Sequence, residues 1–168
     1  LGGNLGDREA RLAEAVARLV EGGVAIDEAS SAYETPPWGG IEQPDFLNAA
    51  VSGTTDLDAR ALLRLCKTIE AEAGRDFGAP RNSARPIDVD ILLIEGERVA
   101  EPDLEVPHAA MHTRGFVLVP LADIAGDVVH PVLQHSVRAL LEELPNEERA
   151  GIRRVAGPDW ARLGQGDA

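Results

Sequence analysis

The sequence predicts a single α+β domain in which helices cover one face of an antiparallel sheet. Two amphipathic helical patterns in the first half each lie between segments of strand character, and shorter helical patterns follow toward the C-terminus. A length of 168 residues suits one domain with a substantial core. We expect this domain to span residues 1–162 and the tail at 163–168 to be disordered.

The chain opens in a glycine turn, Gly2-Gly3-Asn4, so we expect a first strand upstream of Leu1. The first-half elements are, in order, a helix capped by Asp7 and ended by Gly22-Gly23, a strand at 24–33, a loop at 34–45, a strand at 46–54, and a helix from Asp56 or Asp58 to Ala73.

The second-half elements are a loop at 74–84, a buried strand at 85–94, a turn at Glu95-Gly96, a short strand near 98–99, short helices near 108–113, 116–124 and 136–144, and an edge strand near 152–155. The order strand-helix-strand-strand-helix-strand is the split β-α-β, or ferredoxin-like, pattern. Loops as long as 34–45 and 74–84 are unusual in a compact domain and are typical of binding loops.

Composition narrows the class of protein. A formal net charge of −13 argues against nucleic acid or an anionic membrane as the partner. No apolar run is long enough to span a membrane, and no secretory leader pattern opens the sequence. The single cysteine, Cys66, excludes a disulfide framework and favours a reducing, cytoplasmic location.

The segment Arg85-Pro86-Ile87-Asp88-Val89-Asp90 carries two carboxylates on one face of an extended chain. Two like charges side by side on a buried segment call for a cation between them. Mg²⁺ fits best, because it takes one or two carboxylates and completes its shell with water and phosphate oxygens. An exposed edge strand with solvated acids is the alternative.

Arginines surround this acidic pair. Arg75, Arg81 and Arg85 lie in the loop that leads to it, and guanidinium groups match phosphate oxygens. Carboxylates for metal and arginines for phosphate together indicate a metal–polyphosphate site. A solvated basic loop is the simpler alternative.

A further pattern suits a flat heterocycle. The rigid loop around Thr35-Pro36-Pro37-Trp38 precedes Phe46 and Asn48, which share one face of a strand and place a ring beside an amide. Phe46 alone also fits ordinary core packing, whereas a buried Asn48 needs partners. His108, Arg114 and Phe116 could complete the phosphate and ring contacts, although single residues of these types are more often structural.

These segments together resemble the 6-hydroxymethyl-7,8-dihydropterin pyrophosphokinase family of folate biosynthesis. The resembling segments run in order from residue 1 to about 125: Gly2-Gly3-Asn4-Leu5-Gly6-Asp7, Tyr33 to Gly39, Gln43 to Val51, Glu70, Gly74-Arg75, Arg85 to Asp90, Val106-Pro107-His108 and Arg114 to Leu121. Several motifs in one order are far more specific than any one of them.

The resemblance implies transfer of pyrophosphate from ATP to the hydroxymethyl group of the pterin, with release of AMP and with two Mg²⁺ ions held by Asp88 and Asp90. It implies a catalytic set of Arg75, Arg85, Asp88 and Asp90, a pterin-binding set of Thr35, Pro36, Trp38, Phe46, Asn48 and Phe116, and an ATP-binding set of Lys67, Glu70, Arg75, Arg85, Ile91, His108 and Arg114. The expected partners are ATP and a dihydropterin. We expect a monomer that acts beside, or fused to, other folate enzymes.

One departure concerns the loop before the acidic pair. The family often has Arg-Trp-Gly-Pro-Arg there, whereas this chain has Arg81-Asn82-Ser83-Ala84-Arg85. Asn82 therefore takes the place of an aromatic residue that would close over the pterin, and Phe77 is the local side chain left for that role. The departure leaves the metal pair intact.

Three alternative activities stay open at this stage. An ordinary kinase would move only the γ-phosphate and release ADP. A nucleotide-sugar glycosyltransferase would need a larger nucleotide-binding domain than 168 residues provide. A ferredoxin-like binding module without catalysis would leave the paired carboxylates and their arginines unexplained.

Overall fold

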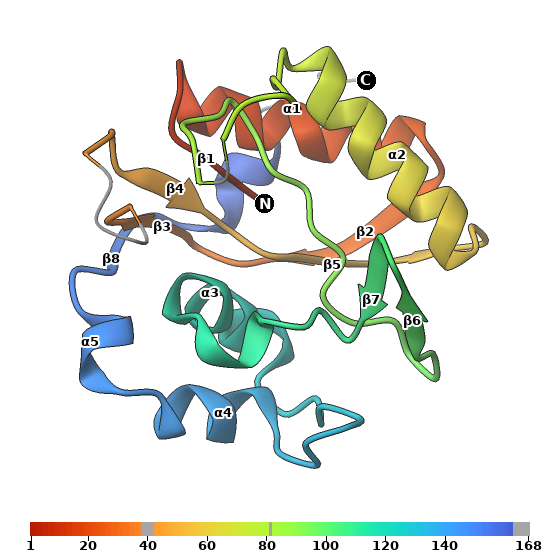
Figure 1. The fold of residues 1–168 in the computed structure, drawn as a ribbon, viewed down its shortest axis with the longest axis vertical. Coiled ribbons are helices and arrows are strands. Elements are labelled where there is room, and N and C mark those ends of the chain that lie inside the picture. The colour runs from red at the N-terminus through yellow and green to blue at the C-terminus, as the bar shows by residue number, and fades with distance from the viewer. Residues whose placement is uncertain (38–41, 81, 163–168) are drawn as a thin grey trace.

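The computed structural model describes residues 1–37, 42–80 and 82–162 (Figure 1). It is an α+β fold built on antiparallel strands, which confirms the predicted class. The predicted tail at 163–168 and the candidate pterin residue Trp38 lie outside the described residues.

The two long strands predicted in the first half are each divided in two. The segment 24–33 contains β2 (Val24–Ala29) and β3 (Ala32–Thr35), and the segment 46–54 contains β4 (Phe46–Asn48) and β5 (Val51–Thr55). β2 pairs with β5, whereas β3 pairs with β4 in a four-stranded sheet of order β1-β4-β3-β8. At the break, the amide of Ser30 donates to the carbonyl of Ala50 at 2.9 Å, and the hydroxyl of Ser30 accepts from the amide of Ala50 at 2.8 Å.

The opening glycines form a strand and not the predicted turn. On one side, β1 (Gly2–Gly3) pairs with β4. On the other side, Gly2 forms an isolated bridge with Asp88 of the segment 85–90, which we call the acidic segment. The absence of a side chain allows this close approach, because a Cβ on Gly3 would lie 2.1 Å from the carbonyl oxygen of Pro86.

The segment 85–94 is not the regular strand that the sequence predicted. Its contact with β1 is limited to that bridge and to backbone bonds around Asn4, and the amide of Val89 donates instead to the Glu70 side chain. Alternation is nevertheless kept, since Ile87 and Val89 are buried while Asp88 and Asp90 face outward.

Helices α1 (Arg8–Glu21) and α2 (Ala59–Glu72) begin and end close to the predicted positions. The carboxylates of Asp7 and Asp58 accept from the backbone amides three residues on, as expected of helix caps. Both helices lie on the same side of the strands (Figure 1). Their inward faces form one apolar core with the sheet, which includes Leu12, Val16, Cys66 and Ile69.

Shorter elements cover the opposite side of the strands (Figure 1). They are η1 (Met111–Thr113), α3 (Gly115–Ala125), α4 (Val137–Glu143) and α5 (Asn146–Arg149). A second core, which includes Met111, Leu118 and Val137, lies within this layer. The edge strand β8 (Arg153–Ala156) then leads to η2 (Pro158–Arg162), whose Trp160 lies in the first core on the side of α1. The hydroxyl of Tyr33 donates to Asp123 and joins β3 to α3.

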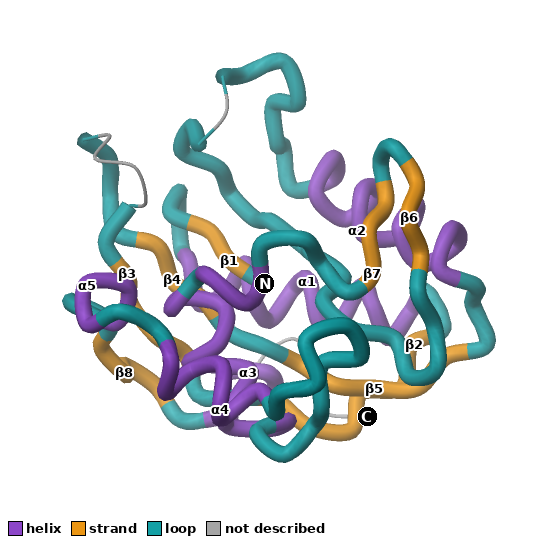
Figure 2. The backbone as a smooth tube through the Cα atoms, turned by 60° about the horizontal axis from the view of Figure 1, so that its bottom comes forward, coloured by secondary structure: helices purple, strands orange, loops and turns teal. Residues whose placement is uncertain are grey.

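A hairpin of β6 (Val99–Glu101) and β7 (Leu104–Val106) stands beside α2 (Figure 2). Arg60 of α2 binds Glu101 and Asp103 of this hairpin, which fixes it against the helix. Among the helices in the described ranges, none has the length and apolar character needed to cross a membrane.

Candidate active site

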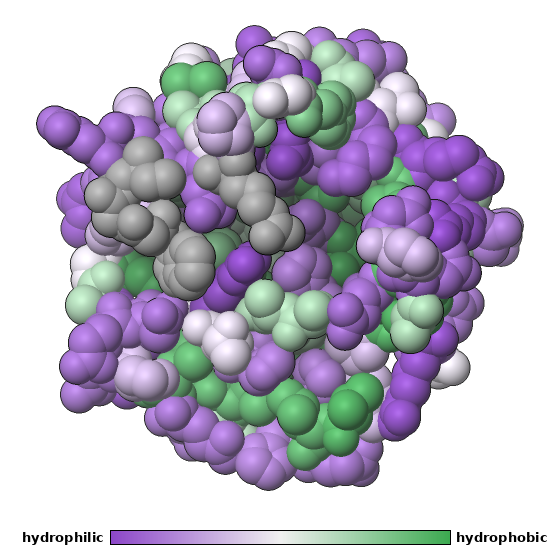
Figure 3. Space-filling view, in the orientation of Figure 1, coloured by the Kyte–Doolittle hydropathy of each residue, from purple (hydrophilic) through white to green (hydrophobic). Residues whose placement is uncertain are grey.

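An open pocket is bounded by strands β1, β3 and β4, by the segment that carries Asp88 and Asp90, and by α3. The face shown in Figure 3 is hollowed near its centre. The pocket encloses about 890 Å³, its solvent-filled mouth included. Its lining comprises Leu1, Gly2, Thr35, Pro36, Gln43, Phe46, Asn48, Ala49, Ala50, Asn82, Arg85, Asp88, Asp90, Leu92, Arg114, Phe116, Val117 and Pro120. Residues far apart in the sequence thus meet at one cavity, among them most of the predicted pterin set.

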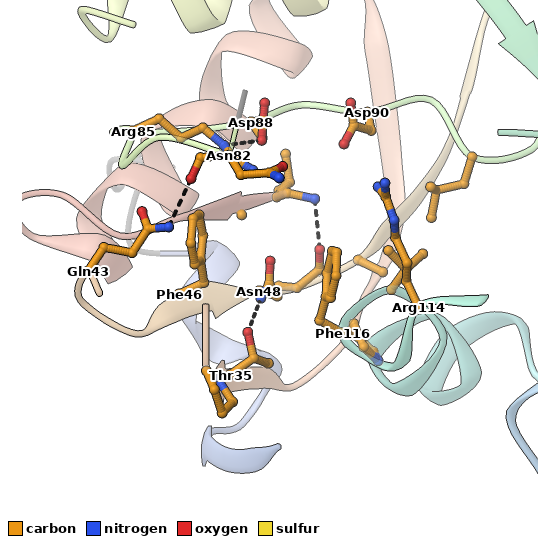
Figure 4. A pocket seen from close by; sticks show the side chains of 18 residues that line it. Thr35, Gln43, Phe46, Asn48, Asn82, Arg85, Asp88, Asp90, Arg114 and Phe116 are labelled. Carbon is orange, nitrogen blue, oxygen red and sulfur yellow. Dashed lines mark hydrogen bonds and ion pairs between the residues drawn. The ribbon is translucent and has the colours of Figure 1, made fainter. Parts of the chain in front are cut away.

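Two aromatic rings stand on either side of a buried amide in this pocket (Figure 4). Phe46 and Asn48 come from β4, and Phe116 comes from the first turn of α3. The Asn48 amide nitrogen donates to the hydroxyl of Thr35 at 2.7 Å, and both side chains are nearly inaccessible to solvent. Gly2 keeps this region open, since a Cβ there would lie 2.2 Å from the Asn48 side-chain oxygen.

Acidic side chains gather at the other end of the pocket. One carboxylate oxygen each from Glu70, Asp88 and Asp90 lies within 4.8 Å of the other two. Asp88 and Asp90 line the pocket, whereas Glu70 is completely buried behind them. This group of carboxylates is the kind of oxygen-donor set that suits a hard divalent cation.

Glu70 anchors the acidic segment. One of its oxygens accepts from the amide of Val89 at 2.8 Å and forms an ion pair with the Arg75 guanidinium at 2.9 Å. The other oxygen accepts from Lys67 at 2.9 Å. Gly74, at φ +87°, ends α2 and turns the chain so that the amide of Arg75 returns to the Glu70 carbonyl at 3.0 Å. The helix end therefore delivers Arg75 directly to the buried carboxylate.

Two arginines bind Asp88. Arg75 donates to one carboxylate oxygen and the Nε of Arg85 donates to the other. The Arg85 guanidinium also lies over the Phe46 ring, 4.8 Å from its centroid, and donates to the carbonyl of Ser83 at 2.8 Å. Arg85 therefore connects the acidic end of the pocket with its aromatic end.

The two long loops are joined at the pocket mouth. The Gln43 amide donates to the Asn82 carbonyl at 2.8 Å, and its oxygen accepts from Asn4 at 3.0 Å. Asn4 is buried, and its own oxygen accepts from the amide of Arg85 at 2.8 Å. Asn82 has φ +64°, a left-handed conformation that asparagine tolerates better than most residues.

The other predicted ATP residues lie around the pocket or outside its wall. Arg114 lines it and points toward Asp90 in Figure 4, with its guanidinium 5.7 Å from the Phe116 ring centroid. Ile91 packs into the core beneath the β6–β7 hairpin. The Nδ1 atom of His108 accepts from the amide of Ala110 at 3.2 Å.

Three polar residues that line the pocket or join its loops were given no role from the sequence. They are Asn4, Gln43 and Asn82. The signal that pointed to them was weak. Asn4 and Gln43 stood inside resembling motifs as polar residues of glycine- or proline-rich turns, and Asn82 stood out only as a departure from the family pattern. Their contacts join segments about 40 and 80 residues apart, which local patterns do not encode.

Comparison with known proteins agrees with this geometry. The 7,8-dihydro-6-hydroxymethylpterin-pyrophosphokinase (HPPK) family matches residues 1–126. A 2-amino-4-hydroxy-6-hydroxymethyldihydropteridine pyrophosphokinase of Methylorubrum extorquens is 44% identical over 156 residues, which cover 92% of this chain and 95% of that protein. A Bacillus subtilis protein of the same name is 45% identical over 129 residues, or 76% of this chain and 77% of that one.

Longer relatives also exist. The mitochondrial folate synthesis bifunctional protein of Arabidopsis thaliana is 42% identical over 129 residues, which make up 77% of this chain but only 23% of that protein. The matched region is thus one part of a larger protein there. The family match covers residues 1–126, and the two bacterial relatives are matched over 95% and 77% of their length. This chain therefore belongs to the 7,8-dihydro-6-hydroxymethylpterin-pyrophosphokinase family.

Proposed function

We propose that this protein transfers the β,γ-pyrophosphoryl group of ATP to the hydroxymethyl oxygen of 6-hydroxymethyl-7,8-dihydropterin and releases AMP, as a step of folate biosynthesis. The observation that carries the proposal is the pocket itself. In a chain of this family, it combines two facing rings and a buried amide with paired carboxylates and arginines.

The aromatic end is the proposed pterin site. A flat ring between Phe46 and Phe116 gains stacking contact on both faces. The oxygen of Asn48 faces the same space, and its amide is held in place by Thr35. We assign pterin-edge recognition to Asn48 and further pterin contacts to Thr35, Pro36 and Trp38.

The acidic end is the proposed site for Mg²⁺ and the ATP phosphates. Asp88 and Asp90 are the proposed ligands of two ions, because both line the pocket while Glu70 is committed to Val89, Lys67 and Arg75. Bound Mg²⁺ would neutralise phosphate charge and lower the pKa of a coordinated alcohol. We assign phosphate oxygens to Arg75, Arg85 and Arg114, and the remainder of the nucleotide to Lys67, Ile91 and His108. The buried Glu70 would act on ATP binding indirectly, through its contacts with Lys67 and Arg75.

In the proposed reaction the pterin hydroxyl oxygen attacks Pβ of ATP. The new bond joins that oxygen to Pβ, the bond from Pβ to the oxygen that bridges it to Pα breaks, and AMP leaves with the bridging oxygen. The hydroxyl proton passes to Asp90 or to water. Positioning and charge neutralisation by the chain's arginines supply most of the rate enhancement, as in other phosphoryl transfers.

The test is incubation with ATP, Mg²⁺ and 6-hydroxymethyl-7,8-dihydropterin, followed by chromatographic separation of the products. The proposal predicts AMP and a diphosphorylated pterin in equal amounts. Formation of ADP and a monophosphorylated pterin would indicate an ordinary kinase instead. Absence of any turnover would indicate a binding module.

The proposal also covers the fold type, the oligomeric state and the location of the protein. We assign the fold to the split β-α-β, ferredoxin-like arrangement. Its first unit would be β1, α1 and the strands β2 and β3, and its second unit would be the strands β4 and β5, α2 and the acidic segment 85–90. We also propose that the protein works as a monomer in the cytoplasm, beside the other enzymes of folate synthesis. The bifunctional relatives named above motivate the last point.

A further inference from the structure

We propose that Arg85 competes with divalent metal for Asp88 in the free protein, and that it is Arg85, and not Arg75, that leaves when metal and phosphate bind. The inference rests on the proposed function, because it concerns how the same site changes from its unliganded arrangement. It assigns different roles to two arginines that the sequence could not tell apart.

Competition follows from the contacts of Asp88. Each of its two carboxylate oxygens already accepts from a guanidinium, one from Arg75 and one from Arg85. The Asp88 side chain is 16% exposed, so these charges interact in a partly desolvated setting. A divalent ion bound to Asp88 meets two adjacent positive charges, and the departure of one guanidinium relieves that repulsion.

Arg75 is held in place by a second carboxylate. Its guanidinium forms an ion pair at 2.9 Å with Glu70, whose side chain is completely buried, and its backbone amide donates to the Glu70 carbonyl. If Arg75 left, the buried negative charge of Glu70 would lose one of its positively charged partners, and an unpaired buried charge is costly. Arg75 also lies against the exposed ring of Phe77, with 5.3 Å between the guanidinium carbon and the ring centroid.

Within residues 1–37, 42–80 and 82–162, the partners of Arg85 other than Asp88 are neutral. These are the Ser83 carbonyl at 2.8 Å and the Phe46 ring. Arg85 lines the pocket, whereas Arg75 is not among the residues of its wall. Arg85 therefore loses less on leaving Asp88, and the phosphates in the pocket offer it a new anionic partner at short range.

Departure of Arg85 has a second effect at the aromatic end. Its guanidinium covers Phe46, the ring that we assign to pterin stacking. Metal and phosphate at the acidic end would draw Arg85 away from that ring. The same side chain thus links occupation of the two ends of the pocket.

The first test measures Mn²⁺ binding to the protein without nucleotide, by electron paramagnetic resonance of the free ion. R85Q is expected to bind Mn²⁺ about fivefold more tightly than the wild type, the scale of one charge–charge contact fully screened by water. R75Q should give a smaller gain, because Arg85 stays on Asp88. R18Q, which removes the same charge from a pair with Glu21 far from the pocket, should give none.

The same variants are then titrated with Mn²⁺ and α,β-methylene-ATP, in which the bond broken by the reaction is blocked. R85Q should bind this complex more weakly than the wild type, opposite in sign to its effect on Mn²⁺ alone. Weaker binding of both probes, or an equal gain in R75Q, would overturn the proposal. A purely structural role for Arg85 gives no such change of sign.

A second measurement uses the wild type and so does not depend on a variant that folds. Mg²⁺ is added to protein with ¹⁵N-labelled arginine, and the Nε–H signals are followed by NMR. The Arg85 signal should shift and exchange faster with water while that of Arg75 persists. Shifts at the Asp88 and Asp90 amides with an unchanged Arg85 signal would overturn the proposal. AMP formation is independent of this result, so failure here leaves the proposed reaction standing.

Discussion

At the scale of single residues, the two carboxylates of the acidic segment have different surroundings. Asp88 is held by Arg75 and Arg85, whereas Asp90 is exposed on the pocket wall. Repulsion between two neighbouring carboxylates, taken by itself, predicts that removing either charge leaves the free protein equally or more stable. The ion pairs of Asp88 now argue otherwise for that residue.

We predict that D88N and D90N each lose most turnover, because each removes a proposed metal ligand. D88N should also lower the free energy of unfolding by about 1–3 kcal/mol, since it leaves charged donors without their partner. D90N, the matched control, should unfold like the wild type. Activity is measured by AMP release and stability by urea titration; near-normal activity in either variant would contradict the metal assignment.

Asn48 carries the second residue-scale prediction. N48A should weaken dihydropterin binding by roughly tenfold to 150-fold, which corresponds to about 1.4–3 kcal/mol for an unpaired buried edge, while ATP binding changes little. T35V removes the hydroxyl that orients the amide and should give a smaller loss of the same kind. Titration calorimetry with each substrate checks both; equal losses for pterin and ATP would point to a structural role instead.

At the scale of elements, α2 combines a packing role with a functional one. Its buried Cys66 lies in the core between the helix and the sheet, and burial raises the pKa of this thiol from 9.0 to about 11. The unfolded chain therefore releases the thiol proton at a lower pH than the folded protein does. The contribution of this thiol to the free energy of unfolding therefore falls as the pH rises between these two pKa values.

We predict that the free energy of unfolding falls as pH increases from about 9 to about 11, by at most about 1.4 kcal/mol per pH unit from this group. C66A should show a flatter profile over the same range. Urea titrations at several pH values measure the difference between the two proteins. Parallel profiles would show that Cys66 does not contribute.

The loop after α2 is the second element with a testable role. Phe77 is 55% exposed there, with Arg75 against its ring, and no aromatic residue stands at position 82. We predict that F77A lowers turnover and raises the ratio of AMP to diphosphorylated pterin, because water reaches the phosphates more easily. V155A, an exposed apolar truncation on β8, is the control; an unchanged ratio in F77A would contradict a covering role.

At the scale of the whole molecule, local signals predicted the parts that depend on local chemistry. Asp7 and Asp58 cap α1 and α2 because a carboxylate satisfies free amides wherever a helix begins. The outward alternation of Asp88 and Asp90 likewise follows from extended backbone. The grouping of a ring, an amide and an acidic pair was accessible because their motifs occur in one order.

Long-range packing decided what the sequence did not show. The two predicted strands break at Ser30 and Ala50, where the paired chains pass from one sheet to the other. The residue composition does not change at these positions, so the sequence did not predict the breaks. The acidic segment lacks a full ladder because the buried Glu70 takes the amide of Val89. The approach of Gly3 to Pro86 and the Gln43–Asn82 contact depend on residues distant in sequence.

The measurement that tests the central claim most directly follows the bond that breaks. ATP labelled with ¹⁸O in the bridge between Pα and Pβ is incubated with Mg²⁺, 6-hydroxymethyl-7,8-dihydropterin and the protein, and the products are examined by mass spectrometry and ³¹P NMR. Attack at Pβ predicts that all of the label appears in AMP, together with a pterin carrying two coupled phosphorus atoms. Label retained in ADP beside a singly phosphorylated pterin, or recovered in free pyrophosphate, would contradict the account.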